Sequence, residues 1–286
     1  MELYDLKTIR PLLERHGFHF SKALGENFLI QEWVPRRILE VSGVDEHSGV
    51  LEVGPGIGVL TQALCCRAGH VVAVELDKAL LPLLDETLAE YPNKTVVSAD
   101  IMKTDIPALV REKLPGLRPL ACANLPYNIT TPVLKALLEA GCFSQITVMV
   151  QKEVAERICA APGTAAYGAF SLFVRYYTEP SICFEVPPNC FYPQPKVTSA
   201  VLTLKQVPPP AALRSKDMLF SLTRAAFAQR RKTLVNGLSP LFAGRLTKEE
   251  LTGVLTACGH DPRVRGETLG LSEFVELANA FTARLG

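Results

Sequence analysis

The stretch Asn124-Leu125-Pro126-Tyr127 places an amide side chain and an aromatic ring on one short corner. It follows the apolar run 120–123, which predicts a buried strand ended by a turn. Pro126 holds its own φ near about −65° and favours extended geometry at Leu125, so the corner is rigid. The Asn124 side-chain oxygen can accept a hydrogen bond from an exocyclic amine, and the Tyr127 ring can stack on a planar base. An Asx-turn with a core tyrosine is the alternative reading of the same residues.

Three glycines, Gly54, Gly56 and Gly58, lie between a predicted strand and a predicted helix, where backbone can approach a ligand closely. The dinucleotide fingerprint needs its third glycine three residues after the second, but here it comes two residues after it. Pro55 also removes one amide donor from the turn. The pattern therefore disfavours a pyrophosphate and favours a nucleoside with a carboxylate tail, S-adenosylmethionine. Tight packing of strand against helix would also explain a glycine-rich turn.

Acidic residues end the next two predicted strands, Glu75 after 71–74 and Asp100 after 95–98. Since carboxyl ends of parallel strands share one edge of a sheet, both carboxylates are expected beside the glycine turn. Glu75 is placed to accept hydrogen bonds from ribose hydroxyls, and Asp100 one from the adenine amine. The residues that follow them, Leu76 and Ile101, are expected at the same pocket. Taken singly, each carboxylate could be an ordinary solvated strand end.

The elements that must position these residues alternate between strand and helix. The sequence predicts an amphipathic helix over 5–16, a helix over 31–42, and strands at 50–53, 71–74, 95–98, 120–123 and 147–150 separated by helical segments. This order predicts an α/β fold with a doubly wound, Rossmann-like parallel sheet, and a β-rich pair at 182–186 and 197–204 predicts two added antiparallel strands. Prolines 208–210 indicate a linker before a helical region. We therefore expect a domain over 1–206 with an N-terminal arm, and a small all-helical domain over 207–286.

Composition bounds the class of protein. The chain has 286 residues, is 48% hydrophobic and carries a formal net charge of +1. Residues 1–206 hold 19 Lys and Arg against 22 Asp and Glu, whereas residues 207–286 hold 11 against 7, which permits a basic C-terminal face. The eight cysteines form no C-x-x-C pair, so we expect neither a metal site nor a disulfide framework. The polar N-terminus and the lack of a long apolar run predict a soluble, cytoplasmic protein.

A basic cluster in the C-terminal region comprises Arg224, Arg230, Arg231 and Lys232. No acidic residue lies between Asp217 and Glu249, so these charges are predicted to lack local helix partners. We expect them, together with Lys196, to contact the phosphates of a nucleic acid. The alternative is that the four residues of the cluster form one solvated face of a helix and bind no partner.

With these residues assembled, the chain closely resembles the bacterial small-subunit rRNA adenine dimethyltransferases, which are known from kasugamycin resistance. The resemblance runs from end to end, through five spaced motifs. These are Glu26–Leu29, Leu51–Gly58, Asn124–Tyr127, Val186–Pro188 with Phe191–Val197, and Phe227–Leu234.

The resemblance implies transfer of two methyl groups to N6 of each of two adjacent adenosines in a hairpin loop near the 3′ end of 16S rRNA. It implies S-adenosylmethionine as cofactor, a 30S particle or its precursor as partner, and a monomeric chain. Asn27 and Leu29 would join Gly54, Gly56, Glu75, Asp100 and Asn124 in the cofactor pocket. Leu125, Pro126 and Tyr127 would complete the catalytic corner, and Phe191 would cover the other face of the base.

Two departures from the family pattern are visible. Glu26 stands for the usual glutamine, and Thr198 follows Pro-Lys-Val where the family often has aspartate. Neither touches the expected chemistry. Two other functions stay open: a 23S rRNA adenine methyltransferase, which shares the corner but lacks the basic motif, and a non-catalytic RNA-binding assembly factor.

Overall fold

The computed structural model describes residues 1–20 and 26–285, and the chain divides into two compact units. Unit 1 comprises Met1–Ala155 and Ser181–Gln206, and unit 2 comprises Glu156–Pro180 and Val207–Gly286. The helical region expected at 207–286 therefore shares its unit with an earlier segment, Glu156–Pro180. The part of the N-terminal arm that includes Lys22 lies outside the described residues.

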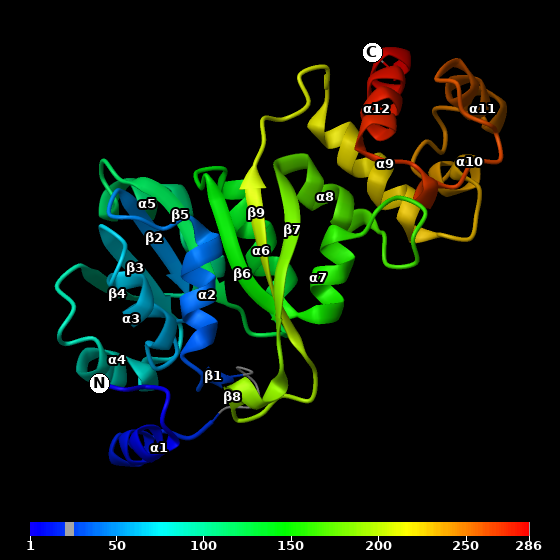
Figure 1. The fold of residues 1–286 in the computed structure, drawn as a ribbon. Coiled ribbons are helices and arrows are strands. Elements are labelled where there is room, and N and C mark those ends of the chain that lie inside the picture. Colours follow the sequence, from blue (N-terminus) through cyan, green and yellow to red (C-terminus); the bar gives the residue numbers. More distant parts are fainter. Residues whose placement is uncertain (21–25, 286) are drawn as a thin grey trace. The chain divides into compact units, whose positions relative to one another are not determined.

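Unit 1 is built on a seven-stranded sheet with the strand order β4-β3-β2-β5-β6-β9-β7 (Figure 1). The first five strands in that order are mutually parallel, and β9 pairs antiparallel with β6. This confirms the predicted doubly wound α/β class. The strands are β2 (Ser48–Val53), β3 (His70–Glu75), β4 (Lys94–Ser98), β5 (Arg118–Asn124), β6 (Gln145–Gln151), β7 (Thr178–Val186) and β9 (Ser199–Gln206).

Helices cover both faces of the sheet (Figure 1), which is why its central strands are apolar throughout rather than alternating. All six residues of β2 are buried. On one face, Val50, Leu120 and Met149 pack with Val34 and Leu64 in a single apolar core. The helices of this unit are α1 (Leu6–Arg15), α2 (Trp33–Ser42), α3 (Val59–Cys65), α4 (Leu81–Thr87), α5 (Ile106–Lys113) and α6 (Thr130–Ala140), with short 3-10 turns η1 (Lys78–Leu80), η2 (Ile101–Lys103) and η3 (Pro188–Cys190).

Local sequence explains where several of these helices begin and end. Asp5 and Asp105 accept hydrogen bonds from the backbone N–H groups of Lys7 and Ala108 and so cap α1 and α5. Gly43 ends α2 with φ of 68°, a left-handed conformation that favours glycine.

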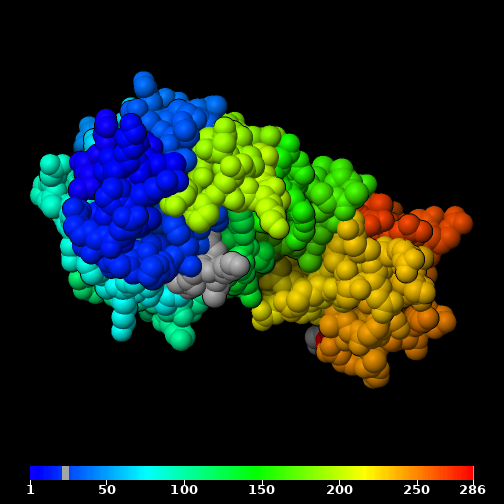
Figure 2. Space-filling view, turned by 90° about the horizontal axis from the view of Figure 1, so that it is seen from below, coloured from blue at the N-terminus to red at the C-terminus, as the bar shows by residue number. Residues whose placement is uncertain are grey.

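A two-stranded antiparallel sheet joins the N-terminal arm to a distant part of unit 1. β1 (Phe28–Leu29) pairs with β8 (Phe191–Tyr192), with Leu29 opposite Phe191. Around it, the Phe20 ring contacts Tyr192 at 5.4 Å between centroids. Figure 2 shows the N-terminal residues in blue bordering the yellow-green residues that precede β9. This pairing holds Phe28 and Leu29 in the apolar core of unit 1.

Unit 2 is helical and has its own core, which includes Tyr167, Phe242, Phe274 and Phe281. Tyr167 is fully buried, and its hydroxyl donates to the carbonyl of Leu269 at 2.8 Å. Residues 156–180 thus belong here because they supply core side chains to the C-terminal helices. The elements are α8 (Ala169–Tyr177), α9 (Lys216–Ala228), α10 (Leu234–Leu238), α11 (Lys248–Ala257), η4 (Gly266–Thr268) and α12 (Leu271–Leu285), while α7 (Lys152–Cys159) and β7 contain residues of both units.

Among the described residues, none of the helices combines the length and the apolar character that crossing a membrane requires.

Candidate active site

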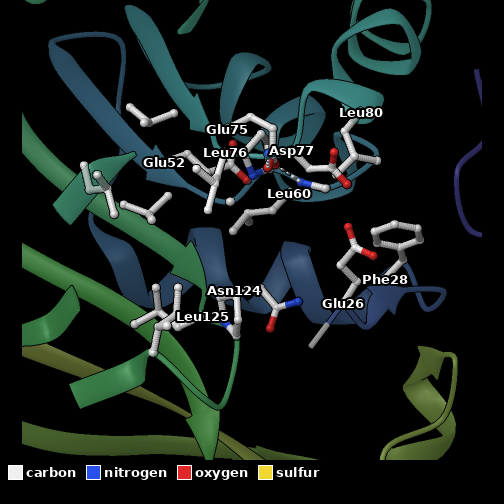
Figure 3. Close-up of a pocket in the computed structure, with 18 of the residues that line it drawn as sticks. Glu26, Phe28, Glu52, Leu60, Glu75, Leu76, Asp77, Leu80, Asn124 and Leu125 are labelled. Carbon is white, nitrogen blue, oxygen red and sulfur yellow. Dashed lines mark hydrogen bonds between the residues drawn. The ribbon is translucent and has the colours of Figure 1, made fainter. Parts of the chain in front are cut away.

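A cavity of about 300 Å³ lies in unit 1 at the carboxyl ends of β2, β3, β4 and β5 (Figure 3). Four sequence segments meet there: the N-terminal arm, the glycine turn after β2, the ends of β3 and β4, and the corner after β5. All the predicted cofactor residues line it, as do three of the corner. These are Asn27, Leu29, Gly54, Gly56, Glu75, Leu76, Asp100, Ile101 and Asn124, with Leu125, Pro126 and Tyr127.

Two glycines of the turn, Gly54 and Gly56, line the cavity, and the backbone of the turn takes left-handed conformations that favour glycine. Gly54, Gly56 and Gly58 have φ of 68°, 61° and 90°. A Cβ on Gly56 would lie 3.1 Å from the ring of Phe28, so this glycine also lets the arm approach the turn. The turn is held by the Gly54 N–H, which donates to the Val74 carbonyl at 3.0 Å.

Glu75 at the end of β3 is 6% exposed, and burial raises the pKa of its carboxyl. One oxygen accepts from the Asp77 N–H at 2.8 Å, and the other from the Gly56 N–H at 3.4 Å. These bonds orient the carboxylate toward the cavity and leave each oxygen a further acceptor position for a vicinal diol.

Apolar side chains flank the neighbouring strand ends. Leu76 is 53% exposed and Met102 is 45% exposed, and both are among the few large hydrophobic residues that the described chain leaves in solvent. Asp100 accepts from the Met102 N–H at 2.9 Å and caps η2, which fixes Ile101 and Met102 at the cavity. Exposed apolar groups beside a carboxylate fit the faces and the amine edge of a purine. The sequence predictions missed Met102, although its position just after Asp100 and Ile101 was the available signal.

The corner after β5 is tied to the arm. The Asn124 amide nitrogen donates to the Asn27 carbonyl at 3.1 Å, so its side-chain oxygen is the atom left for a substrate donor. The Leu125 N–H donates to the Met149 carbonyl at 3.1 Å, and the Pro126 carbonyl accepts from the Thr130 hydroxyl at 3.0 Å. The corner is therefore held from three sides.

Tyr127 is half-buried at the same corner, and burial raises the pKa of its phenol. Its hydroxyl forms a hydrogen bond with Ser199 Oγ at 2.7 Å, and Ser199 is fully buried at the start of β9. This bond sets the plane of the ring. Ser199 was not among the predicted residues because it lies 72 positions away in the chain.

Phe191, predicted to cover the opposite face of a base, is not brought to the cavity. It is 3% exposed and packs in the apolar core of unit 1, where β8 pairs with β1. Its predicted role stays a prediction. Glu26 lines the cavity, so the expectation that this departure from the family pattern lies away from the chemistry is not met. Thr198, the other departure, accepts at its carbonyl from the Lys152 N–H at 3.0 Å.

Three residues of the basic cluster lie in a turn, and one of them has an acidic partner that the sequence predictions did not foresee. α9 ends at Ala228, so Arg230, Arg231 and Lys232 lie in a turn rather than on a helix. Arg230 is also paired: its guanidinium lies 3.2 Å from a carboxylate oxygen of Glu267 and donates to the Ala165 carbonyl at 3.0 Å. The prediction concerned local helix partners only, and this partner is a distant one, because Glu267 lies in η4, 37 positions along the chain.

The other basic residues remain in solvent. Arg224, Arg231 and Lys232 are exposed in unit 2, and Lys196 is exposed in unit 1. Within unit 2, Arg231 and Lys232 are therefore better placed than Arg230 to meet an outside phosphate.

Comparison with known proteins bears on what this cavity does. The profile of the family described as "Ribosomal RNA adenine dimethylase" matches residues 17–269. A protein named "Ribosomal RNA small subunit methyltransferase A" from Geobacillus kaustophilus is 45% identical over 281 residues, covering 97% of this chain and 96% of the relative.

Two solved structures share the fold. A dimethyladenosine transferase from Plasmodium falciparum superposes with a TM-score of 0.77 at 23% identity, covering 90% of this chain and 98% of that one. The 23S rRNA methyltransferase ErmE gives a TM-score of 0.67 at 25% identity, covering 91% and 99%. The family match spans most of the sequence, including every segment that lines the cavity. This chain thus belongs to the ribosomal RNA adenine dimethylase family and is an S-adenosylmethionine-dependent rRNA adenine methyltransferase.

Proposed function

We propose that the chain dimethylates N6 of two adjacent adenosines in a hairpin loop near the 3′ end of 16S rRNA, within the 30S subunit or its precursor. The observation that carries this proposal is the bond from the Asn124 amide nitrogen to the Asn27 carbonyl. Because this bond uses the amide nitrogen, the amide oxygen is left as an acceptor, which suits an exocyclic amine. The small-subunit substrate is supported by the name of the 45% identical relative and by the Phe227–Leu234 motif.

The residues present fit the cofactor. Glu75, oriented by the Gly56 and Asp77 N–H groups, would accept hydrogen bonds from the ribose hydroxyls. Leu76, Ile101 and Met102 would flank the adenine. Asp100 would accept a hydrogen bond from the adenine amine. When bound, S-adenosylmethionine supplies an electrophilic methyl group. Asn27 and Leu29 would close this pocket from the arm.

Catalysis would rest on positioning. The lone pair of an adenine amine is conjugated with the ring, which makes it a poor nucleophile. If the two N–H groups of the amine donated hydrogen bonds to the Asn124 side-chain oxygen and the Leu125 carbonyl, the nitrogen would favour a pyramidal geometry. Tyr127, held by Ser199, would stack on the base and align the nitrogen for in-line attack. The methylated nitrogen then loses its proton readily, so rate would come from orientation and electrostatic complementarity.

The target adenosines must leave their stack to enter the cavity, which is least costly in a loop. A 23S rRNA substrate is the second candidate, favoured only by the structural likeness to ErmE.

The test is incubation with labelled cofactor and under-methylated 30S particles, alongside 50S particles, followed by mapping of modified nucleotides. We expect label at two adjacent adenosines of 16S rRNA. Label in 23S rRNA would overturn the proposal in favour of the second candidate. Cofactor binding without label in either particle would favour a non-catalytic assembly factor.

A further inference from the structure

The wall of the cavity carries several acids. Among its described residues there are five carboxylates and no lysine, arginine or histidine. The acids are Glu26, Glu52, Glu75, Asp77 and Asp100. Four of them belong to strands of the sheet or to the turns that follow, whereas Glu26 belongs to the N-terminal arm. A wall of this charge favours a ligand that carries positive charge.

Glu26 is held beside the catalytic corner. Figure 3 shows its half-buried side chain leaving the arm toward the end of β3. The carbonyl of the next residue, Asn27, accepts from the Asn124 amide nitrogen at 3.1 Å. The ring of Phe28 packs against Gly56, where a Cβ would lie 3.1 Å from it. The arm therefore runs from the corner to the glycine turn, with Glu26 at the corner side.

The other acids at the strand ends account for the adenosine half of the cofactor. Glu75 would accept hydrogen bonds from the ribose, and Asp100 with its apolar neighbours would hold the adenine. The methyl group must reach Asn124, where the substrate amine would bind. The methionine tail of the cofactor therefore extends from the ribose along the corner side of the cavity, which is the side where the arm places Glu26.

We propose that Glu26 binds the α-ammonium group of S-adenosylmethionine and thereby sets the direction of the methionine tail. The inference rests on the assignment of this cavity to the cofactor. The tail ends in an ammonium and a carboxylate, and the Glu26 carboxylate attracts the first and repels the second. An ammonium group donates hydrogen bonds only, and a carboxylate accepts them as strong, charge-assisted bonds. An amide at position 26 both donates and accepts, so it would not distinguish the two groups.

Calorimetric titration of the natural chain and of Glu26→Gln with three ligands tests this contact. S-adenosylmethionine and S-adenosylhomocysteine carry the ammonium group, whereas 5′-methylthioadenosine keeps the adenosine and the sulfur but lacks both charged groups of the tail. We expect Glu26→Gln to raise the dissociation constant about tenfold or more for the first two ligands, because a hydrogen bond between charged groups is lost, and to leave it unchanged for the third. Glu32→Gln is the matched control, because it removes the same charge from an exposed residue at the start of α2 and should change none of the three.

Three results for Glu26→Gln would overturn the inference. An equal loss of affinity for all three ligands would show that the substitution displaces the arm. A loss confined to S-adenosylmethionine would show that Glu26 faces the sulfonium group, which only that ligand carries. No loss for any ligand would show that Glu26 does not contact the tail.

The natural chain alone provides a second measurement that does not depend on the folding of a variant. We expect it to bind S-adenosylhomocysteine at least about tenfold more tightly than the analogue in which hydrogen replaces the ammonium group. Equal affinity for these two ligands would reject the role of Glu26 while leaving the proposed function intact. Failure of the folded natural chain to bind S-adenosylmethionine would instead reject the proposed function.

Discussion

At the scale of single residues, Asn124 carries two interactions with separate purposes. Its nitrogen is anchored to the Asn27 carbonyl, and its oxygen is left as an acceptor at the cavity that the residue lines. Anchoring one end of a planar amide determines the direction of the other. The residue is thus oriented before any ligand arrives, which is the condition for electrostatic catalysis without reorganisation.

Asn124→Ala should lower the rate of methyl transfer by about 10²–10³, because an acceptor specific to the transition state is lost. The affinity for the cofactor should change much less, as Glu75 and the glycine turn are untouched. Single-turnover methylation and calorimetric binding measure the two effects separately. Near-normal turnover in the variant would contradict the role assigned to the amide oxygen.

Glu75→Ala should raise the dissociation constant for the cofactor by roughly tenfold or more, since hydrogen bonds to a charged group contribute ~1.5–3 kcal/mol. Binding to RNA should stay the same. Thr61→Ser keeps a hydroxyl on the neighbouring helix α3 and serves as control. Unchanged affinity for the cofactor would mean that the carboxylate only braces the glycine turn through Gly56.

Glu52, a buried residue of β2, should make the stability of the folded protein fall as pH rises, whereas a paired carboxylate makes it rise. Its pKa is about 8 in the folded protein against 4.5 for the free side chain, so the unfolded chain loses the proton first as pH rises. The contribution of this carboxyl to the free energy of unfolding is fully present below about pH 4.5. It is lost as pH rises toward 8, by up to ~1.4 kcal/mol per pH unit.

Without cofactor, Glu52→Gln should therefore gain melting temperature relative to the natural chain, by a few degrees more at pH 8 than at pH 5.5. Scanning calorimetry at the two pH values gives this difference, in which effects of packing common to both pH values cancel. A difference that does not vary with pH would show that Glu52 is already ionised in the folded protein.

At the scale of elements, the turn after α9 contains basic residues with two different roles. Arg230 connects the turn to η4 and to the Ala165 carbonyl, whereas Arg231 and Lys232 face solvent. The same cluster thus contains one residue that supports unit 2 and two that are free to meet phosphates. Chain position alone does not distinguish them.

Arg231→Ala combined with Lys232→Ala should weaken binding to 30S particles and make the slope of log affinity against log salt shallower by about one to two units, one per lost phosphate contact. Affinity for the cofactor should not change. Arg263→Ala, which removes another exposed arginine of unit 2, is the control for net charge. Arg230→Ala should instead lower the melting temperature, because Glu267 loses one of its two arginine partners and the Ala165 carbonyl loses a donor. An unaltered salt slope in the double variant would show that these two residues do not contact RNA phosphates. The RNA-binding surface would then have to be sought elsewhere, first around Lys196.

At the scale of the whole molecule, the two compact units are not consecutive in sequence. The chain leaves the sheet after β6, contributes α8 to the helical unit, and returns through β7 and β9 before the C-terminal helices follow. Tyr167 and Leu172, from the early segment, are almost completely buried in the same core as Phe274 and Phe281. Each unit therefore depends on two separate stretches of chain.

A fragment of residues 207–286 should not unfold cooperatively, because it lacks the side chains that Glu156–Pro180 adds to its core. Thermal denaturation followed by circular dichroism would show a broad, shallow transition. Adding a peptide of residues 156–180 should sharpen it. A sharp transition of the fragment alone would show that the C-terminal helices suffice for a core.

The sequence by itself determined the features that depend on neighbouring residues. Runs of β-branched residues separated by amphipathic segments indicate a parallel sheet, and in such a sheet strand ends share one edge. For that reason Glu75, Asp100 and Asn124 could be predicted to meet, and all three line one cavity. The glycine turn could be located in the same way, since its conformation is a local property.

Only the tertiary structure decided the contacts between distant segments. The Asn27–Asn124 bond spans 97 positions, Tyr127 and Ser199 are 72 apart, and Arg230 and Glu267 are 37 apart. These depend on the register of β1 with β8, on the antiparallel pairing of β9 and on the packing of η4 against α9. The burial that changes the pKa of Glu52 has the same origin, because a strand residue is desolvated by the layers that cover it and not by its neighbours in sequence.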